Sequence, residues 1–190
     1  ERIEVAELRL GETRITGELR PPPRDGEPWR IVARGPLLDL SNRPGGTGDA
    51  APAAADTTPP LAVEARFDRV RLGEARESRN VTVSLRHDGR RLQALEVRGE
   101  LGERGSYTAS LRPGEGGRVL ELRSDDAGAL LAWLDVLDSM AGGRLAVTAR
   151  YDDRKPSAPL AGEATIEEFR LRDAPAIGRV LQAMTLYGLL

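Results

Sequence analysis

Apolar and polar residues alternate in short segments along most of the chain. This period of two is typical of β-strands that turn one face toward an apolar environment and the other toward water. The segments that show it are 3–10, 15–19, 29–33, 61–67, 81–85, 95–101, 107–111, 120–122, 145–151 and 160–166. The pattern therefore predicts a mainly β protein.

The turns between these segments indicate how the strands pair. The clearest is His87-Asp88-Gly89-Arg90, because Asp-Gly supplies the positive φ that a tight hairpin turn requires. A hairpin joins antiparallel neighbours. We therefore expect a largely antiparallel sheet.

The region near 125–139 breaks the alternation and predicts a helix of about three turns. Its apolar stripe has helical spacing and consists of Leu130, Leu131, Leu134 and Leu137. Ser124 or Asp125 is the expected N-terminal cap, and Gly142-Gly143 is the expected end.

A second helix is predicted near 175–185. Pro175 suits an early helical position because its fixed φ matches the helix. The apolar face of this helix consists of Ile177, Val180, Leu181 and Met184. The fold class is thus a β sheet with two short amphipathic helices.

Three strand segments share one unusual order of residues. Segments 5–10, 67–72 and 166–171 each read apolar, two mostly charged or small positions, apolar, Arg, Leu. The parity of the apolar positions slips by one residue midway, which in a strand indicates a bulge or a corner. We expect these slips to make the sheet curl.

Residues 43–60 are rich in proline, glycine and alanine and contain no large apolar residue. Such a composition favours a flexible linker. The predicted organisation is an N-terminal β segment at 1–42, a linker at 43–60 and a β domain at 61–190.

Composition argues against several kinds of chemistry. The chain has no cysteine and a single histidine, His87, so neither a thiolate site nor a multi-histidine zinc site is available. We interpret His87 as an exposed turn residue, Asp125-Asp126 as helix-capping acids and Asp152-Asp153 as a solvated turn. No glycine-rich phosphate loop is present. We therefore expect no enzyme activity, no metal and no cofactor.

The formal net charge is −2, and acidic and basic residues interleave along the segments. With only 4% aromatic residues, a nucleic-acid partner is disfavoured. No run approaches the ~20 apolar residues of a membrane span. Because the chain begins at Glu1 and ends after the apolar run 186–190, we expect it to be a section of a longer protein, with any anchor or targeting segment outside it.

The pattern leaves the purpose of the apolar faces open. An interior sheet face and a ligand-binding sheet face have the same periodicity, so alternation alone does not separate a covered core from a binding surface.

Several segments resemble a known family. Ser124-Asp125-Asp126-Ala127-Gly128-Ala129-Leu130-Leu131 and Asp173-Ala174-Pro175 are the most specific, and 29–35, 38–41, 67–73 and 186–190 match the style of the same family. Together they resemble the AsmA-like proteins of Gram-negative bacteria, in particular the YhdP-type branch.

The resemblance implies a long periplasmic protein, anchored in the inner membrane outside this chain, whose β units form a curled sheet with an open apolar groove. Such a groove would bind phospholipid acyl chains and pass them toward the outer membrane, without catalytic residues. The alternative is a structural β scaffold for envelope assembly, and protein partners are left open.

On this hypothesis the helices plug or buttress the groove. The residues expected to line it are Val63, Phe67, Val81, Val83, Leu85, Leu95, Val97, Leu145, Val147, Ile166 and Phe169.

Overall fold

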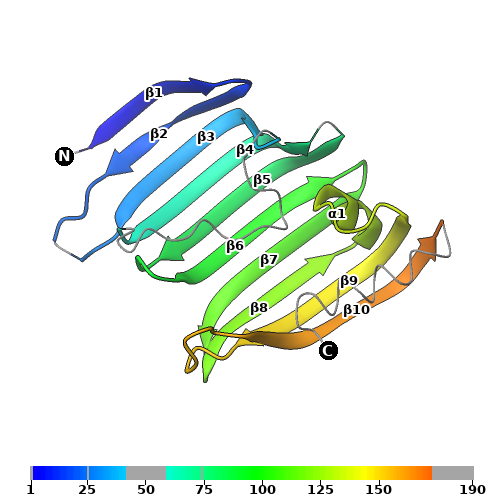
Figure 1. Cartoon of the computed structure of the whole chain (residues 1–190). Helices are drawn as coiled ribbons and strands as arrows, with labels where there is room; N and C mark the ends of the chain where they lie inside the picture. Colours follow the sequence, from blue (N-terminus) through cyan, green and yellow to red (C-terminus); the bar gives the residue numbers. More distant parts are fainter. Residues whose placement is uncertain (1, 25, 42–58, 74, 173–190) are drawn as a thin grey trace. The chain divides into compact units, whose positions relative to one another are not determined.

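The structure, a computed structural model, describes residues 2–24, 26–41, 59–73 and 75–172. Within these ranges it contains ten strands and one helix, so the protein is mainly β, as the alternation predicts. The chain divides into two compact units, residues 1–98 and 99–190. Figure 1 shows the strands of each unit side by side in chain order.

Unit 1 is a sheet in which strands that follow one another in sequence are neighbours. Its strands are β1 (Ile3–Leu10), β2 (Thr13–Arg20), β3 (Trp29–Asp39), β4 (Leu61–Gly73) and β5 (Arg76–His87). The strand β6 (Leu92–Leu101) crosses the boundary between the units.

Pairing in unit 1 is antiparallel except between β3 and β4, which are parallel. The register runs from Trp29 opposite Leu61 to Asp39 opposite Arg71. A parallel pair requires the chain to return to the starting end of the sheet, which a tight turn does not allow. The connection between Asp39 and Leu61 is long enough for that return, and it contains the Pro/Ala/Gly segment 43–60, of which residues 42–58 lie outside the described ranges.

Unit 2 has a sheet of four antiparallel strands and the helix. Its elements are β7 (Gly105–Gly114), β8 (Gly117–Ser124), α1 (Ala127–Trp133), β9 (Met140–Tyr151) and β10 (Leu160–Leu171). Neighbouring strands pair in chain order. Across both units, every segment with predicted alternation falls within a strand, so the strand prediction is confirmed.

The helix α1 has seven residues and is shorter than the predicted span of 125–139. Its N-terminal cap is Asp126, whose Oδ1 accepts a hydrogen bond from the Ala129 backbone N–H at 2.9 Å, so the prediction of Ser124 or Asp125 as the cap was wrong. Ser124 binds Ser106 instead, with its hydroxyl donating to the Ser106 carbonyl.

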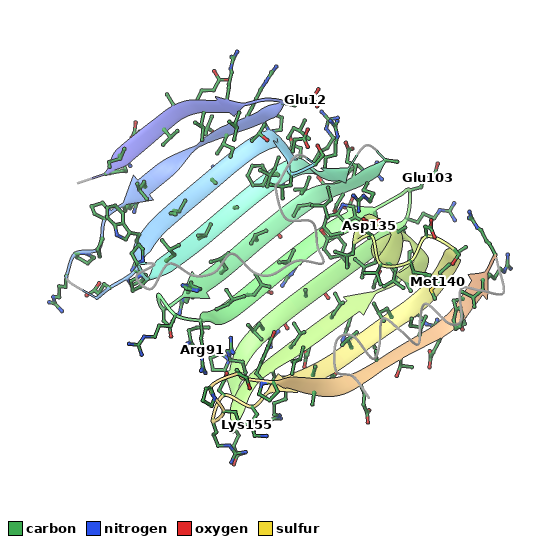
Figure 2. All side chains as sticks on the ribbon, viewed as in Figure 1. Glu12, Arg91, Glu103, Asp135, Met140 and Lys155 are labelled. Atoms are coloured by element: carbon green, nitrogen blue, oxygen red, sulfur yellow. The ribbon has the colours of Figure 1, made fainter. Side chains whose placement is uncertain are left out.

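The end of α1 explains why it is short. Asp135 has φ +61°, its N–H bonds the Ala132 carbonyl, and the next N–H, of Val136, bonds the Leu131 carbonyl. These two bonds form a Schellman motif, which normally uses glycine at the left-handed position. Gly142-Gly143 therefore does not end the helix and lies inside β9. Asp135 and Met140, where β9 begins, are labelled in Figure 2.

The second predicted helix, near 175–185, lies outside the described residues, and so do Ile177, Val180, Leu181 and Met184. One helix is present in the part of the chain that the structure describes.

The predicted slips in the alternation of apolar residues are confirmed, and they arise from two kinds of backbone irregularity. In β1 the pairing with β2 shifts between Val5 and Leu8, which is a bulge. In β10 the register with β9 stays constant, and in β4 the register with β5 stays constant as far as Arg71 and shifts between Arg71 and Gly73. In both pairs of strands the backbone kinks at residues with positive φ. Asn80, opposite the slip in β4, has φ +50°, and Glu168 in β10 has φ +58° opposite Gly143 at φ +93°.

Replacing Asp126 with Ala tests the cap. The change removes the acceptor of the Ala129 N–H, and we expect the free energy of unfolding of unit 2 to fall by about 1 kcal/mol. Asp126→Asn keeps an acceptor oxygen and should lose less than half of that. Urea unfolding followed by Trp133 fluorescence, in a Trp29→Phe background, measures the difference. Equal stability of the Ala variant and the parent would contradict the assignment.

Candidate apolar binding face

The central strands of unit 1 place their apolar side chains on one face of the sheet. Rows of paired residues run across β3, β4 and β5, and they are apolar except where His87 pairs with Leu61 and Gly35 pairs with Phe67. We call this surface the apolar face of unit 1, and it consists of Trp29, Ile31, Ala33, Leu61, Val63, Ala65, Phe67, Val81, Val83 and Leu85. Five of the predicted groove residues are therefore brought together here: Val63, Phe67, Val81, Val83 and Leu85.

The opposite face of the same strands is charged. Arg30, Arg34, Glu64 and Arg66 alternate with the apolar residues and are exposed. Two residues of this face are apolar: Val32, which lies between Glu18 on β2 and Glu64 on β4, and Ala62, which pairs with Arg30 and Arg86. The two faces of unit 1 thus differ sharply in chemistry, and a sheet with one wet and one apolar face is common among antiparallel sheets.

Burial decreases across the apolar face. Phe67 and Val81 are buried, while Val63, Val83 and Leu85 are half-buried. At β1 the exposed fractions rise to 52% for Ile3, 51% for Leu8 and 75% for Leu10. Unit 1 therefore carries an apolar surface that reaches solvent.

Unit 2 also places predicted groove residues together, but partly beneath the helix. Ile166 pairs with Leu145, and Ala164 pairs with Val147. The helix packs on β9, and the Trp133 ring lies 5.3 Å from the Tyr107 ring. Tyr107 and Leu145 both pair with Ser124, so their side chains lie on the same face of the sheet. Trp133 therefore packs on the face that carries Leu145, which is buried. In unit 2, α1 therefore buttresses one end of the apolar face.

The remaining predicted lining and stripe residues vary in exposure. Leu95 and Val97 on β6 are half-buried and alternate with exposed Glu96 and Arg98, whereas Phe169, beyond the kink in β10, is 42% exposed. In the helix stripe, Leu130 and Leu137 are buried, and Leu131 and Leu134 are half-buried. Leu134 and Leu137 follow α1 instead of lying within it.

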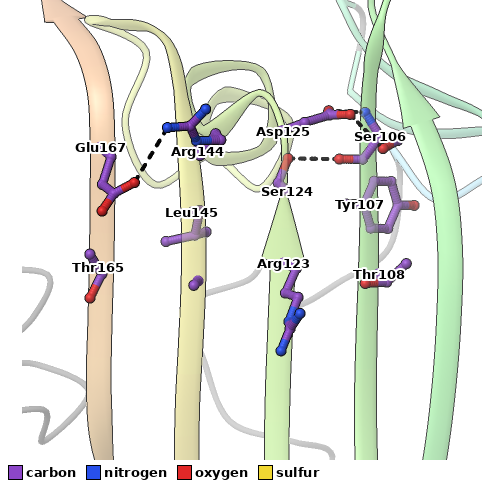
Figure 3. Close-up of a pocket in the computed structure, with 11 residues that line it drawn as sticks. Ser106, Tyr107, Thr108, Arg123, Ser124, Asp125, Arg144, Leu145, Thr165 and Glu167 are labelled. Carbon is purple, nitrogen blue, oxygen red and sulfur yellow. Dashed lines mark hydrogen bonds and ion pairs between the residues drawn. The ribbon is translucent and has the colours of Figure 1, made fainter.

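A shallow hollow of about 460 Å³ lies in unit 2 (Figure 3). The Ser106 hydroxyl donates to the Asp125 carboxylate at 2.8 Å. Arg144 forms ion pairs with Glu167 at 3.5 Å and with Glu168 at 2.8 Å. Arg144 is therefore paired with acidic side chains of β10, and Asp125 is held by Ser106.

The hollow does not assemble a nucleophile and a base. Ser106 contacts a carboxylate without an imidazole between them, and the one histidine of the chain is His87, the last residue of β5. Among the described residues, no group of three acidic or histidine side chains could hold a metal ion. The arrangement suits a structural role for Ser106 and Asp125.

The predicted turn forms between β5 and β6, at residues 88–91, directly after His87. The Gly89 N–H donates to His87 Nδ1 at 3.0 Å, and Gly89 has φ +96°. Asp88 Oδ1 accepts from the backbone N–H groups of Arg91 and Arg90, and these bonds lower the pKa of the Asp88 carboxyl to about 2. His87 is the last residue of β5, where it pairs with Leu61 and is half-buried, so the prediction of an exposed turn residue was wrong.

The acidic pair Asp152-Asp153 is more than a solvated turn. Asp153 accepts two hydrogen bonds from the Arg118 side chain, at 2.7 Å and 3.0 Å, and one from its backbone N–H. Arg118 is buried and lies over the Tyr151 ring at 4.4 Å. This bidentate pair ties the start of β8 to the end of β9. The sequence signal for it was weak, because the partners are far apart along the chain.

No protein-family model matches the chain, and comparison with curated proteins and with solved structures finds no significant match. The resemblance to AsmA-like proteins therefore stays a prediction. Among the described residues, no helix has the length and hydropathy needed to span a bilayer.

The Asp88 carboxyl provides a pH test of the hairpin. Because its folded pKa is lowered to about 2, its contribution to stability is complete above the ordinary carboxyl pKa of about 3.9 and disappears as the pH falls through about 2. Carboxyl-detected NMR titration should find this low value in the protein and the ordinary value in a peptide of residues 86–92. A pKa near 4 in the protein would contradict the turn geometry.

Proposed function

We propose that this protein binds phospholipid acyl chains on its apolar sheet face, as a section of a periplasmic lipid-transfer bridge. The observation that supports the proposal best is the one-sided sheet of unit 1. Its apolar face runs from buried Phe67 and Val81 to half-buried Val83 and to the exposed side chains of β1.

The physical basis is the burial of methylene groups. Each buried CH₂ contributes about 0.8 kcal/mol, so ten methylenes along the face contribute about 8 kcal/mol before the costs of binding. Such a surface recognises hydrocarbon and needs no specific head-group site. Rows of aliphatic side chains, such as Ile31 beside Val63 and Leu85, suit this kind of contact.

The charged face has a complementary role. Exposed Arg34, Glu64 and Arg66 keep that side of the sheet in water, which leaves the apolar side for the lipid. Location in the periplasm, attachment to the inner membrane outside this chain and an open groove formed by a curled sheet all belong to the same proposal. They rest on the family resemblance and on the one-sided sheet.

A pair of matched valine variants tests the proposal. Val83→Lys places an ammonium group on the apolar face, whereas Val32→Lys places the same group on the charged face beside Glu18 and Glu64. We expect Val83→Lys to weaken lipid binding more than tenfold, because burying a charge without a partner costs several kcal/mol. Val32→Lys should bind like the parent.

Binding is measured by transfer of fluorescent-acyl phosphatidylethanolamine from phosphatidylethanolamine/phosphatidylglycerol vesicles to the purified chain. Circular dichroism confirms that both variants are folded. Parent protein that takes up no lipid, or equal uptake by both folded variants, would contradict the proposal. The first result would favour the structural scaffold for envelope assembly.

A further inference from the structure

The outer edge of β1 is the most exposed apolar element of the described structure. The strand order ends at β1, which pairs with β2 on one side. Four large apolar side chains are exposed among the described residues, and three of them, Ile3, Leu8 and Leu10, lie on β1. An apolar edge strand is a template for pairing with another strand.

The bulge in β1 determines which of its side chains lie on each face of the sheet. Val5 pairs with Gly17 and Leu8 pairs with Ile15, so the two residues between them share a single opposing position. The apolar residues on both sides of the bulge therefore lie on the same face, and the charged residues Glu4 and Arg9 lie on the other.

This arrangement is nearly symmetric about the middle of the strand. Reading β1 from either end gives apolar, charged, apolar, two central residues, apolar, charged, apolar. The charges at the two charged positions are opposite, with Glu4 near one end and Arg9 near the other. A strand with this pattern is complementary to an antiparallel copy of itself.

We propose that β1 pairs in antiparallel fashion with β1 of a second copy of this chain. A two-fold axis passes between Ala6 and Glu7, as in the isologous interfaces of most dimers. Ile3 then lies opposite Leu10 of the second copy, Val5 opposite its Leu8, and Glu4 opposite its Arg9. The last pair occurs twice because of the symmetry.

The register of this β1–β1 pairing is specified by the match of apolar positions with apolar positions and of Glu4 with Arg9. A shift of one residue places Glu4 opposite Leu8 or Leu10 of the second copy, so that apolar and charged positions no longer match. The strand at the other end of the order, β10, lacks this complementarity. Full antiparallel overlap of two copies of β10 places Glu163 opposite Glu168.

Charge reversal tests this register. Glu4→Arg places Arg opposite Arg9 of the second copy, and Arg9→Glu places Glu opposite its Glu4, so each variant opposes like charges twice. We expect the dissociation constant of the dimer to rise about tenfold in either variant. An equimolar mixture of the two variants opposes unlike charges at both positions and should associate like the parent.

Sedimentation velocity of the whole chain between 1 and 100 µM measures the association, and circular dichroism confirms the fold of each variant. Glu64→Arg, which makes the same charge change on β4, is the control and should leave the dimer unchanged. A parent that stays monomeric, reversals without effect on a dimer, or a mixture that does not recover would each overturn the proposal. None of these results depends on lipid binding.

Discussion

The strands of this protein must keep their apolar side chains on one face over their whole length. In a regular strand the faces alternate strictly, and a single slip in the sequence would send the rest of the apolar residues to the opposite face. The structure absorbs each slip locally, with a bulge in β1 and with facing kinks at Asn80 and at Glu168 opposite Gly143. The chemical separation of the two faces depends on these few backbone positions.

The separation of apolar and charged faces determines which surface of each unit a ligand could bind. In unit 2, Trp133 packs on Tyr107, and α1 covers the end of the face where Leu145 is buried. In unit 1 the apolar surface extends to the exposed side chains of β1. Asp153 and Arg118 are examples of polar side chains that bind each other within the fold, and the described residues contain no group of three acidic or histidine side chains that could hold a metal ion. The apolar face of unit 1 is therefore the feature that most needs a functional explanation.

Much of the fold could be predicted from the sequence, because period-two alternation and the Asp88-Gly89 turn are local signals. Three features were not local. The parallel pairing of β3 with β4 depends on a long connection whose composition does not reveal where it returns. The helix ends at Asp135, although glycine is the usual residue in that conformation. Asp126 became the cap because Ser124 and Asp125 bind Ser106. Five of the residues expected to line the groove share one face of unit 1, but periodicity could not tell the buried members of the set from the exposed ones.

On the proposed function, hydrocarbon lies against the apolar face of unit 1 and not against the charged face. Intermolecular nuclear Overhauser effects between the acyl methylenes of bound phosphatidylglycerol and the valine methyls test it most directly. Val63 and Val83 lie on the apolar face and Val32 on the charged face. We expect cross-peaks to Val63 and Val83 and none to Val32. Cross-peaks to Val32 alone, or to none of the three at saturating lipid, would contradict it.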